Sequence, residues 1–134
     1  MIPPLWPALI TCLALIVYAW TFIACGTARG KYGVKAPAVT GHPEFEKRFR
    51  IQQNTLEQLV IFLPSLWIFS ATVSPVWGGA LGLVFVVARL VYAVSYAGDP
   101  EKRGPGFGLG AIATLILLAG GLIGVIRLMA MGPA

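Results

Sequence analysis

The chain has 134 residues, of which 57% are hydrophobic and only 11% are charged, with a formal net charge of +5. A soluble domain averages about 25% charged residues, so this composition excludes an ordinary soluble globular domain and indicates an integral membrane protein. The positive charge is not accompanied by a recognition motif or by interleaved aromatic and basic residues, which argues against a nucleic-acid-binding protein.

Four apolar runs follow one another along the chain, and each predicts a membrane-spanning helix. The expected helices cover approximately residues 5–28, 44–73, 76–97 and 106–131. A helix needs roughly 20 residues to cross the hydrocarbon core of a bilayer. The second run reaches that length only if its helix includes the polar stretch 51–58. Because four spans leave little chain for anything else, we expect one all-α membrane domain over residues 1–134, built as a four-helix bundle.

A cleaved signal peptide is the alternative interpretation of the first run. That run lacks a basic start, is long for the apolar part of a signal peptide, and is followed by three further spans. We therefore expect residues 5–28 to remain in the protein as its first membrane helix.

The second helix is expected to begin well before it enters the membrane. Pro43 followed by Glu44 and Glu46 is typical of a helix start, because proline suits the first turn and acidic side chains favour the positive end of the helix dipole. His42, in the Pro- and Gly-rich connection just before this start, has no evident partner, so we expect it to be a solvated loop residue.

Charges are unevenly distributed over the connections between the expected helices. The first connection and its borders, residues 29–50, are basic, and the third connection contains Lys102 and Arg103. The second connection, near residues 74–75, has no charge. Because cytoplasmic loops are enriched in Lys and Arg, we expect the first and third connections to face the cytoplasm and both termini to face the opposite side. Arg127 is the exception, and its long side chain is expected to reach the membrane interface.

A polar stripe marks the start of the second membrane span. Arg50, Asn54 and Glu57 are spaced so that they fall on one face of a helix. Ionisable side chains are costly inside a membrane and generally face a partner, a cavity or a ligand. The stripe therefore predicts a binding site near one end of this helix.

A second polar group lies on the third helix and is expected at the same end of the bundle. Arg89, Tyr92 and Tyr96 are three and four residues apart and share a helical face. This helix returns toward the cytoplasmic side, where Arg29 ends the first helix and Arg103 occupies the third connection. We infer that arginine, asparagine, glutamate and tyrosine side chains converge there.

Each of these residues also has a purely structural interpretation. Tyr92 and Tyr96 fit an aromatic belt at the membrane interface, and Arg50 fits a side chain that reaches up to water. Arg89 and Glu57 fit a structural ion pair between helices. None of these interpretations explains why all four residue types gather at one end.

Several stretches of this chain resemble a known family. The segment Glu44-Phe-Glu-Lys-Arg-Phe-Arg-Ile-Gln-Gln-Asn-Thr-Leu-Glu57, continued by Phe62-Leu-Pro-Ser-Leu-Trp67, resembles the signature of the MAPEG proteins, which are membrane-associated proteins of eicosanoid and glutathione metabolism. Ala88-Arg-Leu-x-Tyr92 on the third helix extends the similarity. The resemblance spans most of the chain and includes the order of four helices.

The resemblance implies a homotrimer that binds glutathione between neighbouring subunits near the cytoplasmic face. It also implies that Arg103 stabilises the glutathione thiolate, and no metal is expected. Two departures, Gly30 and Gln58, replace residues found in leukotriene-forming members and argue against eicosanoid specificity. The residues implied to bind glutathione are Arg29, Arg50, Gln52, Asn54, Glu57, Tyr92 and Tyr96.

The chemistry of these residue types suits glutathione, which has two carboxylates and an ammonium group. Arginine binds carboxylates through paired hydrogen bonds, and Glu57 offers a partner for the ammonium group. A guanidinium group also favours a thiolate over a thiol. We therefore expect a membrane glutathione transferase with peroxidase activity, whose second substrate is a lipophilic electrophile or hydroperoxide arriving from the bilayer.

Two other functions remain as alternatives. The first is a non-catalytic lipid-binding scaffold, a role known within the resembled family. The second is a small multidrug transporter, which would need a carboxylate near the middle of the membrane and an internal repeat, whereas Glu57 lies near one end and no repeat is evident. In a host without glutathione, another low-molecular-weight thiol would take its place.

Overall fold

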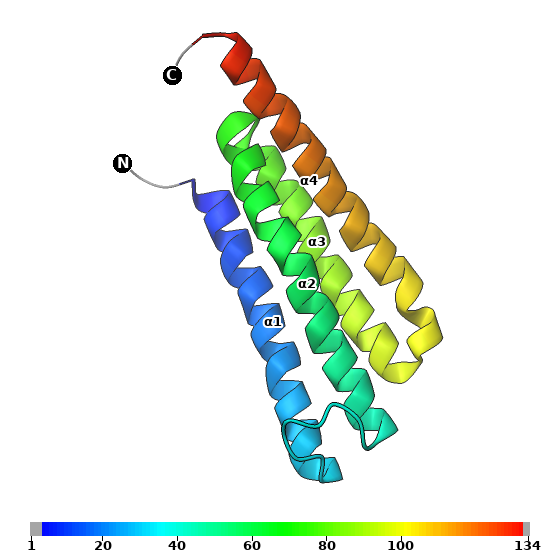
Figure 1. Cartoon of the computed structure of the whole chain (residues 1–134). Helices are drawn as coiled ribbons and strands as arrows, with labels where there is room; N and C mark the ends of the chain where they lie inside the picture. Colours follow the sequence, from blue (N-terminus) through cyan, green and yellow to red (C-terminus); the bar gives the residue numbers. More distant parts are fainter. Residues whose placement is uncertain (1–3, 133–134) are drawn as a thin grey trace.

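The computed structural model describes residues 4–132. Within this range all the regular secondary structure is helical, and there is no strand. Four of the helices are long and apolar enough to cross a membrane, so the chain is an integral, multi-pass membrane protein. The helices are α1 (Leu5–Tyr32), α2 (Pro43–Thr72), α3 (Pro75–Gly98), the short 3-10 helix η1 (Pro100–Arg103) and α4 (Gly104–Ala130) (Figure 1).

The ends of the helices follow local chemistry. α1 continues beyond the expected end at residue 28, and it stops at Tyr32 because Gly33 adopts the left-handed conformation, with φ of 68°. α2 begins at Pro43, where the side chain of His42 caps the helix: Nδ1 accepts a hydrogen bond from the backbone N–H of Glu44 at 3.1 Å. His42 also stacks on Tyr32, with ring centroids 4.0 Å apart. His42 thus lies in the connection, as expected, and is half-buried, but the expectation that it has no partner was wrong.

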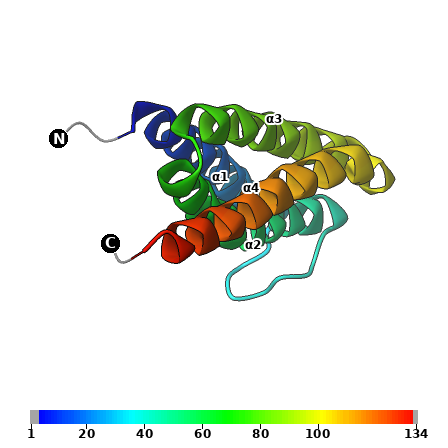
Figure 2. The ribbon, with the colours of Figure 1, turned by 90° about the horizontal axis from the view of Figure 1, so that it is seen from above.

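The four long helices form a bundle with α2 and α3 at its centre. These two helices pack against each other and against both outer helices, whereas α1 and α4 lie on opposite sides of the pair (Figure 1). Seen from above, the connection at residues 33–42 runs outside the bundle (Figure 2). This connection and η1 lie at the end of the bundle opposite the two termini (Figure 1). We call this end of the bundle the charged end.

The core lies where α2 and α3 meet. Phe62 and Phe85 stack with centroids 3.7 Å apart, and Leu66 and Leu117 are fully buried beside them. The outer surfaces of the helices expose many large apolar side chains, as expected for a bundle surrounded by lipid.

A close approach between α3 and α4 fixes the geometry of the charged end. A Cβ atom on Gly106 would lie 2.5 Å from the backbone nitrogen of Tyr92, so only glycine allows α4 to pass this close. Tyr92 is itself buried and belongs to a small cluster with Ile51 and Ala93. The packing of α4 therefore determines where Tyr92 is held.

Candidate functional site

A hollow of about 310 Å³ opens at the charged end between α2, α3 and η1. Because one wall comes from α2 and the other from α3 and η1, the shape of the hollow depends on how α2 packs against α3. The residues that line it are Arg50, Gln53, Asn54, Glu57, Tyr92, Tyr96 and Arg103.

The α2 wall of the hollow is the polar stripe expected from the sequence. Arg50, Asn54 and Glu57 all line it. Arg50 and Glu57 are exposed, and among residues 4–132 neither forms an ion pair. Their charges are therefore available to a ligand.

A buried arginine supports this wall from behind. Arg89 is only 2% exposed, and its Nη2 donates hydrogen bonds of 2.9 Å to Oδ1 of Asn54 and to Oγ1 of Thr55. Its guanidinium carbon also lies 4.1 Å from the centre of the Tyr92 ring. Arg89 thus joins α3 to α2 and contacts two residues that line the hollow. The alternative of an Arg89–Glu57 ion pair is not what the structure contains, since Arg89 bonds to Asn54 and Thr55 instead.

The α3 and η1 wall carries the two tyrosines and Arg103. The rings of Tyr92 and Tyr96 lie 5.7 Å apart, and the guanidinium carbon of Arg103 lies 6.0 Å from the centre of the Tyr96 ring. η1 begins at a cap in which Oδ1 of Asp99 accepts a hydrogen bond from the N–H of Glu101 at 3.0 Å. Arg103 also donates to the carbonyl of Pro100 at 2.7 Å, which leaves the rest of its guanidinium group exposed at the hollow.

Two of the expected glutathione-binding residues lie elsewhere in the chain. Nη1 of Arg29 donates to the carbonyl of Ala38 at 2.7 Å, and its guanidinium group covers the ring of Phe45 at 4.7 Å. Nε2 of Gln52 donates a long hydrogen bond, 3.5 Å, to the hydroxyl of Tyr18 on α1. Within one chain, therefore, Arg29 and Gln52 belong to the contact between α1 and α2, and they do not line the hollow.

The sequence reasoning missed one residue that lines the hollow, Gln53. Its position was detectable, because Gln53 follows Arg50 by three residues and precedes Glu57 by four, so it continues the stripe on the same helical face. Its amide adds a second neutral hydrogen-bonding group to a wall that otherwise carries an arginine, an asparagine and a glutamate.

The combination of groups at the hollow suits a small, water-soluble ligand that carries charges of both signs. Arg50 and Arg103 can bind carboxylates or stabilise an anion, and Glu57 can accept hydrogen bonds from an ammonium group. Among the described residues there is no group of three His, Cys, Asp or Glu side chains that could hold a metal ion.

Comparison with known proteins places the chain in a family. The model of the MAPEG family matches residues 6–123. An uncharacterized protein of Synechocystis sp. is 47% identical over 91% of this chain and 89% of its own length. Human microsomal glutathione S-transferase 2 is 39% identical over 88% of this chain and 80% of its own length, and bovine leukotriene C4 synthase is 33% identical over 72% and 64%. With its four membrane-spanning helices and a family match over nearly the whole sequence, the chain belongs to the MAPEG family.

Proposed function

We propose that the protein is a membrane-bound glutathione transferase that joins glutathione to lipophilic electrophiles. The observation that carries the proposal is the hollow at the charged end, where Arg50, Glu57 and Arg103 present free charges beside Asn54, Tyr92 and Tyr96. The similarity of the chain to human microsomal glutathione S-transferase 2 supports glutathione as the thiol.

One carboxylate, the ammonium group and the thiol of glutathione each have a matching partner in the hollow. Arg50 binds a carboxylate, Glu57 receives the ammonium group, and the amide of Asn54, held by Arg89, donates to a ligand oxygen. Arg103 lies at the opposite wall, beside Tyr96, and is assigned to the sulfur. The free thiol has a pKa of about 8.5 and is mostly protonated at neutral pH, so a nearby guanidinium group increases the reactive thiolate fraction.

The reaction follows from that thiolate. The thiol proton leaves to solvent, the sulfur attacks an electrophilic carbon, and a C–S bond forms while the leaving group departs with its electron pair. With a lipid hydroperoxide, the thiolate attacks the terminal oxygen, which yields an alcohol and a sulfenate. The sulfenate takes up a proton, and a second glutathione converts the resulting sulfenic acid to a disulfide with release of water. We propose the transferase as the main activity and this peroxidase reaction as a second activity of the same site.

We further propose that the protein acts as a homotrimer with the hollow at a subunit boundary. Arg29 and Gln52 lie on the α1–α2 side of the chain, away from the hollow, so one subunit alone does not bring all the expected residues together. A neighbouring subunit that presents its own Arg29 and Gln52 to the hollow would complete the set. We also propose that the whole chain forms one membrane domain with its charged end facing the cytoplasm.

The proposal is tested by measuring conjugation of glutathione to 1-chloro-2,4-dinitrobenzene and reduction of cumene hydroperoxide by the purified protein. We expect both reactions, and we expect Glu57→Gln to weaken them. Replacement of Arg127, at the far end of α4, serves as a matched control that leaves them unchanged. A folded protein without either activity and without affinity for glutathione would favour a lipid-binding scaffold instead.

A further inference from the structure

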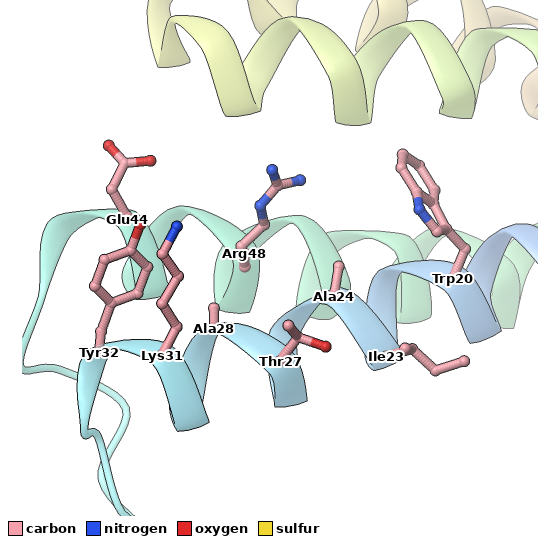
Figure 3. Close-up of a pocket in the computed structure, with 9 residues that line it drawn as sticks. All are labelled: Trp20, Ile23, Ala24, Thr27, Ala28, Lys31, Tyr32, Glu44 and Arg48. Atoms are coloured by element: carbon pink, nitrogen blue, oxygen red, sulfur yellow. The ribbon is translucent and has the colours of Figure 1, made fainter.

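A second groove, of about 460 Å³, lies between α1 and α2 at the charged end and shares no residue with the hollow (Figure 3). Its α2 side is formed by Glu44 and Arg48, and its α1 side runs from Trp20 to Tyr32. We call it the α1–α2 groove. The side chains of Trp20, Lys31 and Arg48 point to the same side of the helix pair, toward α3 (Figure 3).

The outer part of the α1–α2 groove is positively charged. Lys31 and Arg48 both line it, and among the residues from 4 to 132 neither forms an ion pair. The one carboxylate in the groove, that of Glu44, already accepts a hydrogen bond from Nζ of Lys47 at 3.0 Å. Two cations are therefore available to an anion at this end of the groove.

The inner part of the groove is apolar and open at the surface of the bundle. Trp20, Ile23 and Ala24 line it, and Trp20 and Ile23 are 39% and 60% exposed. At 1.5 Å per residue, Trp20 lies about 16 Å along α1 from Lys31, which matches a substantial part of a lipid acyl chain. Tryptophan favours the interface between headgroups and hydrocarbon, so its position fits a ligand that crosses that interface.

We propose that the α1–α2 groove binds an anionic phospholipid. Its phosphate lies between Lys31 and Arg48, and one acyl chain follows α1 past Ile23 and Trp20. Basic pockets between membrane helices bind anionic lipid headgroups, and arginine and lysine form strong charge-assisted hydrogen bonds to phosphate. A soluble phosphate would satisfy the cations but would leave the apolar part of the groove without a ligand. The site is separate from the hollow and does not depend on the proposed function.

The test uses quenching of Trp20 by brominated lipid in phosphatidylcholine nanodiscs. The Trp20 contribution is the fluorescence of the wild type minus that of Trp20→Phe. Because each cation near the surface contributes about fivefold to relative lipid affinity, brominated phosphatidylglycerol should reach half-maximal quenching at a mole fraction at least about fivefold lower than brominated phosphatidylcholine. Equal quenching by the two lipids in the wild type would overturn the proposal without any charge variant.

A pair of matched charge variants separates the groove from general surface charge. The double variant Lys31→Gln, Arg48→Gln should abolish the preference for phosphatidylglycerol. The control double variant Lys35→Gln, Lys102→Gln removes the same charge from exposed positions outside the groove. This variant should retain the preference for phosphatidylglycerol. Equal loss in both variants would contradict a specific site.

A third arm distinguishes lipid from soluble phosphate. Excess glycerol phosphate should leave the quenching by brominated phosphatidylglycerol unchanged, because the acyl chain contributes to binding. If glycerol phosphate abolishes the preference, the groove binds a soluble phosphate compound and the lipid assignment is wrong.

Discussion

Nη2 of Arg89 donates a hydrogen bond of 2.9 Å to Oδ1 of Asn54 and so connects α3 to α2 behind the wall of the hollow. The same guanidinium group lies 4.1 Å from the centre of the Tyr92 ring, so one buried cation contacts residues on both walls. Since Oδ1 of Asn54 is already used as an acceptor, its amide N–H groups remain as donors for a ligand. The relationship makes Arg89 a positioning residue for the proposed glutathione site.

Replacing Arg89 by methionine should weaken glutathione binding although Arg89 does not line the hollow. The hydrogen bond from Asn54 to the ligand contributes about 0.5–1.5 kcal/mol, so we expect the Kd to rise by up to about tenfold as Asn54 loses its orientation. Calorimetry on the detergent-purified variant measures this change.

A double-mutant cycle supplies the control for this prediction. If Arg89 acts through Asn54, then Asn54→Ala should cost little further affinity in the Arg89→Met protein. Full additivity of the two losses would show that Arg89 acts on binding by another route.

Glu57→Gln should reduce affinity for glutathione by removing the charged partner of its ammonium group. The loss of a charge-assisted hydrogen bond predicts a Kd higher by about tenfold or more. The matched comparison is a glutathione analogue without the amino group, which should bind the wild type and Glu57→Gln with similar affinity. If the variant loses equal affinity for both ligands, Glu57 does not bind the ammonium group.

Arg103→Ala should depress turnover more than it weakens glutathione binding. Without the guanidinium group the pKa of the bound thiol rises, so less thiolate is present at neutral pH. The rise of kcat with pH, which follows ionisation of the thiol, therefore moves to higher pH. One pKa unit corresponds to about 1.4 kcal/mol, or about a tenfold change in thiolate fraction below the pKa. The ultraviolet absorbance of the thiolate and the pH profile of kcat both measure this shift.

The neighbouring cation Lys102 provides the control for Arg103. Lys102 is exposed on the same short helix and does not line the hollow, so Lys102→Ala should leave the pH profile unchanged. An unshifted profile in Arg103→Ala would remove Arg103 from its assigned role.

Gly106→Ala should destabilise the bundle and disturb the site, because the added Cβ would lie 2.5 Å from the backbone nitrogen of Tyr92. Overpacking of this kind costs about 1–3 kcal/mol. Gly108→Ala is the matched control, since nothing lies within 4 Å of its added Cβ, and alanine is the better helix former. Thermal unfolding in detergent should therefore show a lower midpoint for Gly106→Ala and an unchanged or higher one for Gly108→Ala.

The four helices and the stripe of Arg50, Asn54 and Glu57 could be predicted because they depend on local rules. Runs of apolar residues of sufficient length form membrane helices, and residues three or four apart share a face whatever the helix packs against. The same rules explain why Tyr92 and Tyr96 were expected together.

The rest of the site depends on packing that local rules do not contain. Gln52 and Gln53 are adjacent, but one residue turns a helix by about 100°; the spacing places Gln53 on the face of the stripe, whereas the contact of Gln52 with Tyr18 depends on how α1 packs against α2. The hydrogen bond from Arg89 to Asn54 likewise depends on how α2 and α3 are positioned relative to each other along the bundle axis. Arg29 does not line the hollow of its own chain. The turn after Gly33 places the carbonyl of Ala38 2.7 Å from Nη1 of Arg29, which donates a hydrogen bond to it.

The most direct test of the central claim is calorimetric titration of glutathione into the detergent-purified protein, with Arg50→Ala and Arg127→Ala compared. We predict saturable binding to the wild type and to Arg127→Ala, and affinity lower by about tenfold or more in Arg50→Ala, because a charge-assisted bond to a glutathione carboxylate is lost. Absence of binding to the folded wild type, or equal affinity in Arg50→Ala, would contradict the assignment of the hollow as a glutathione site.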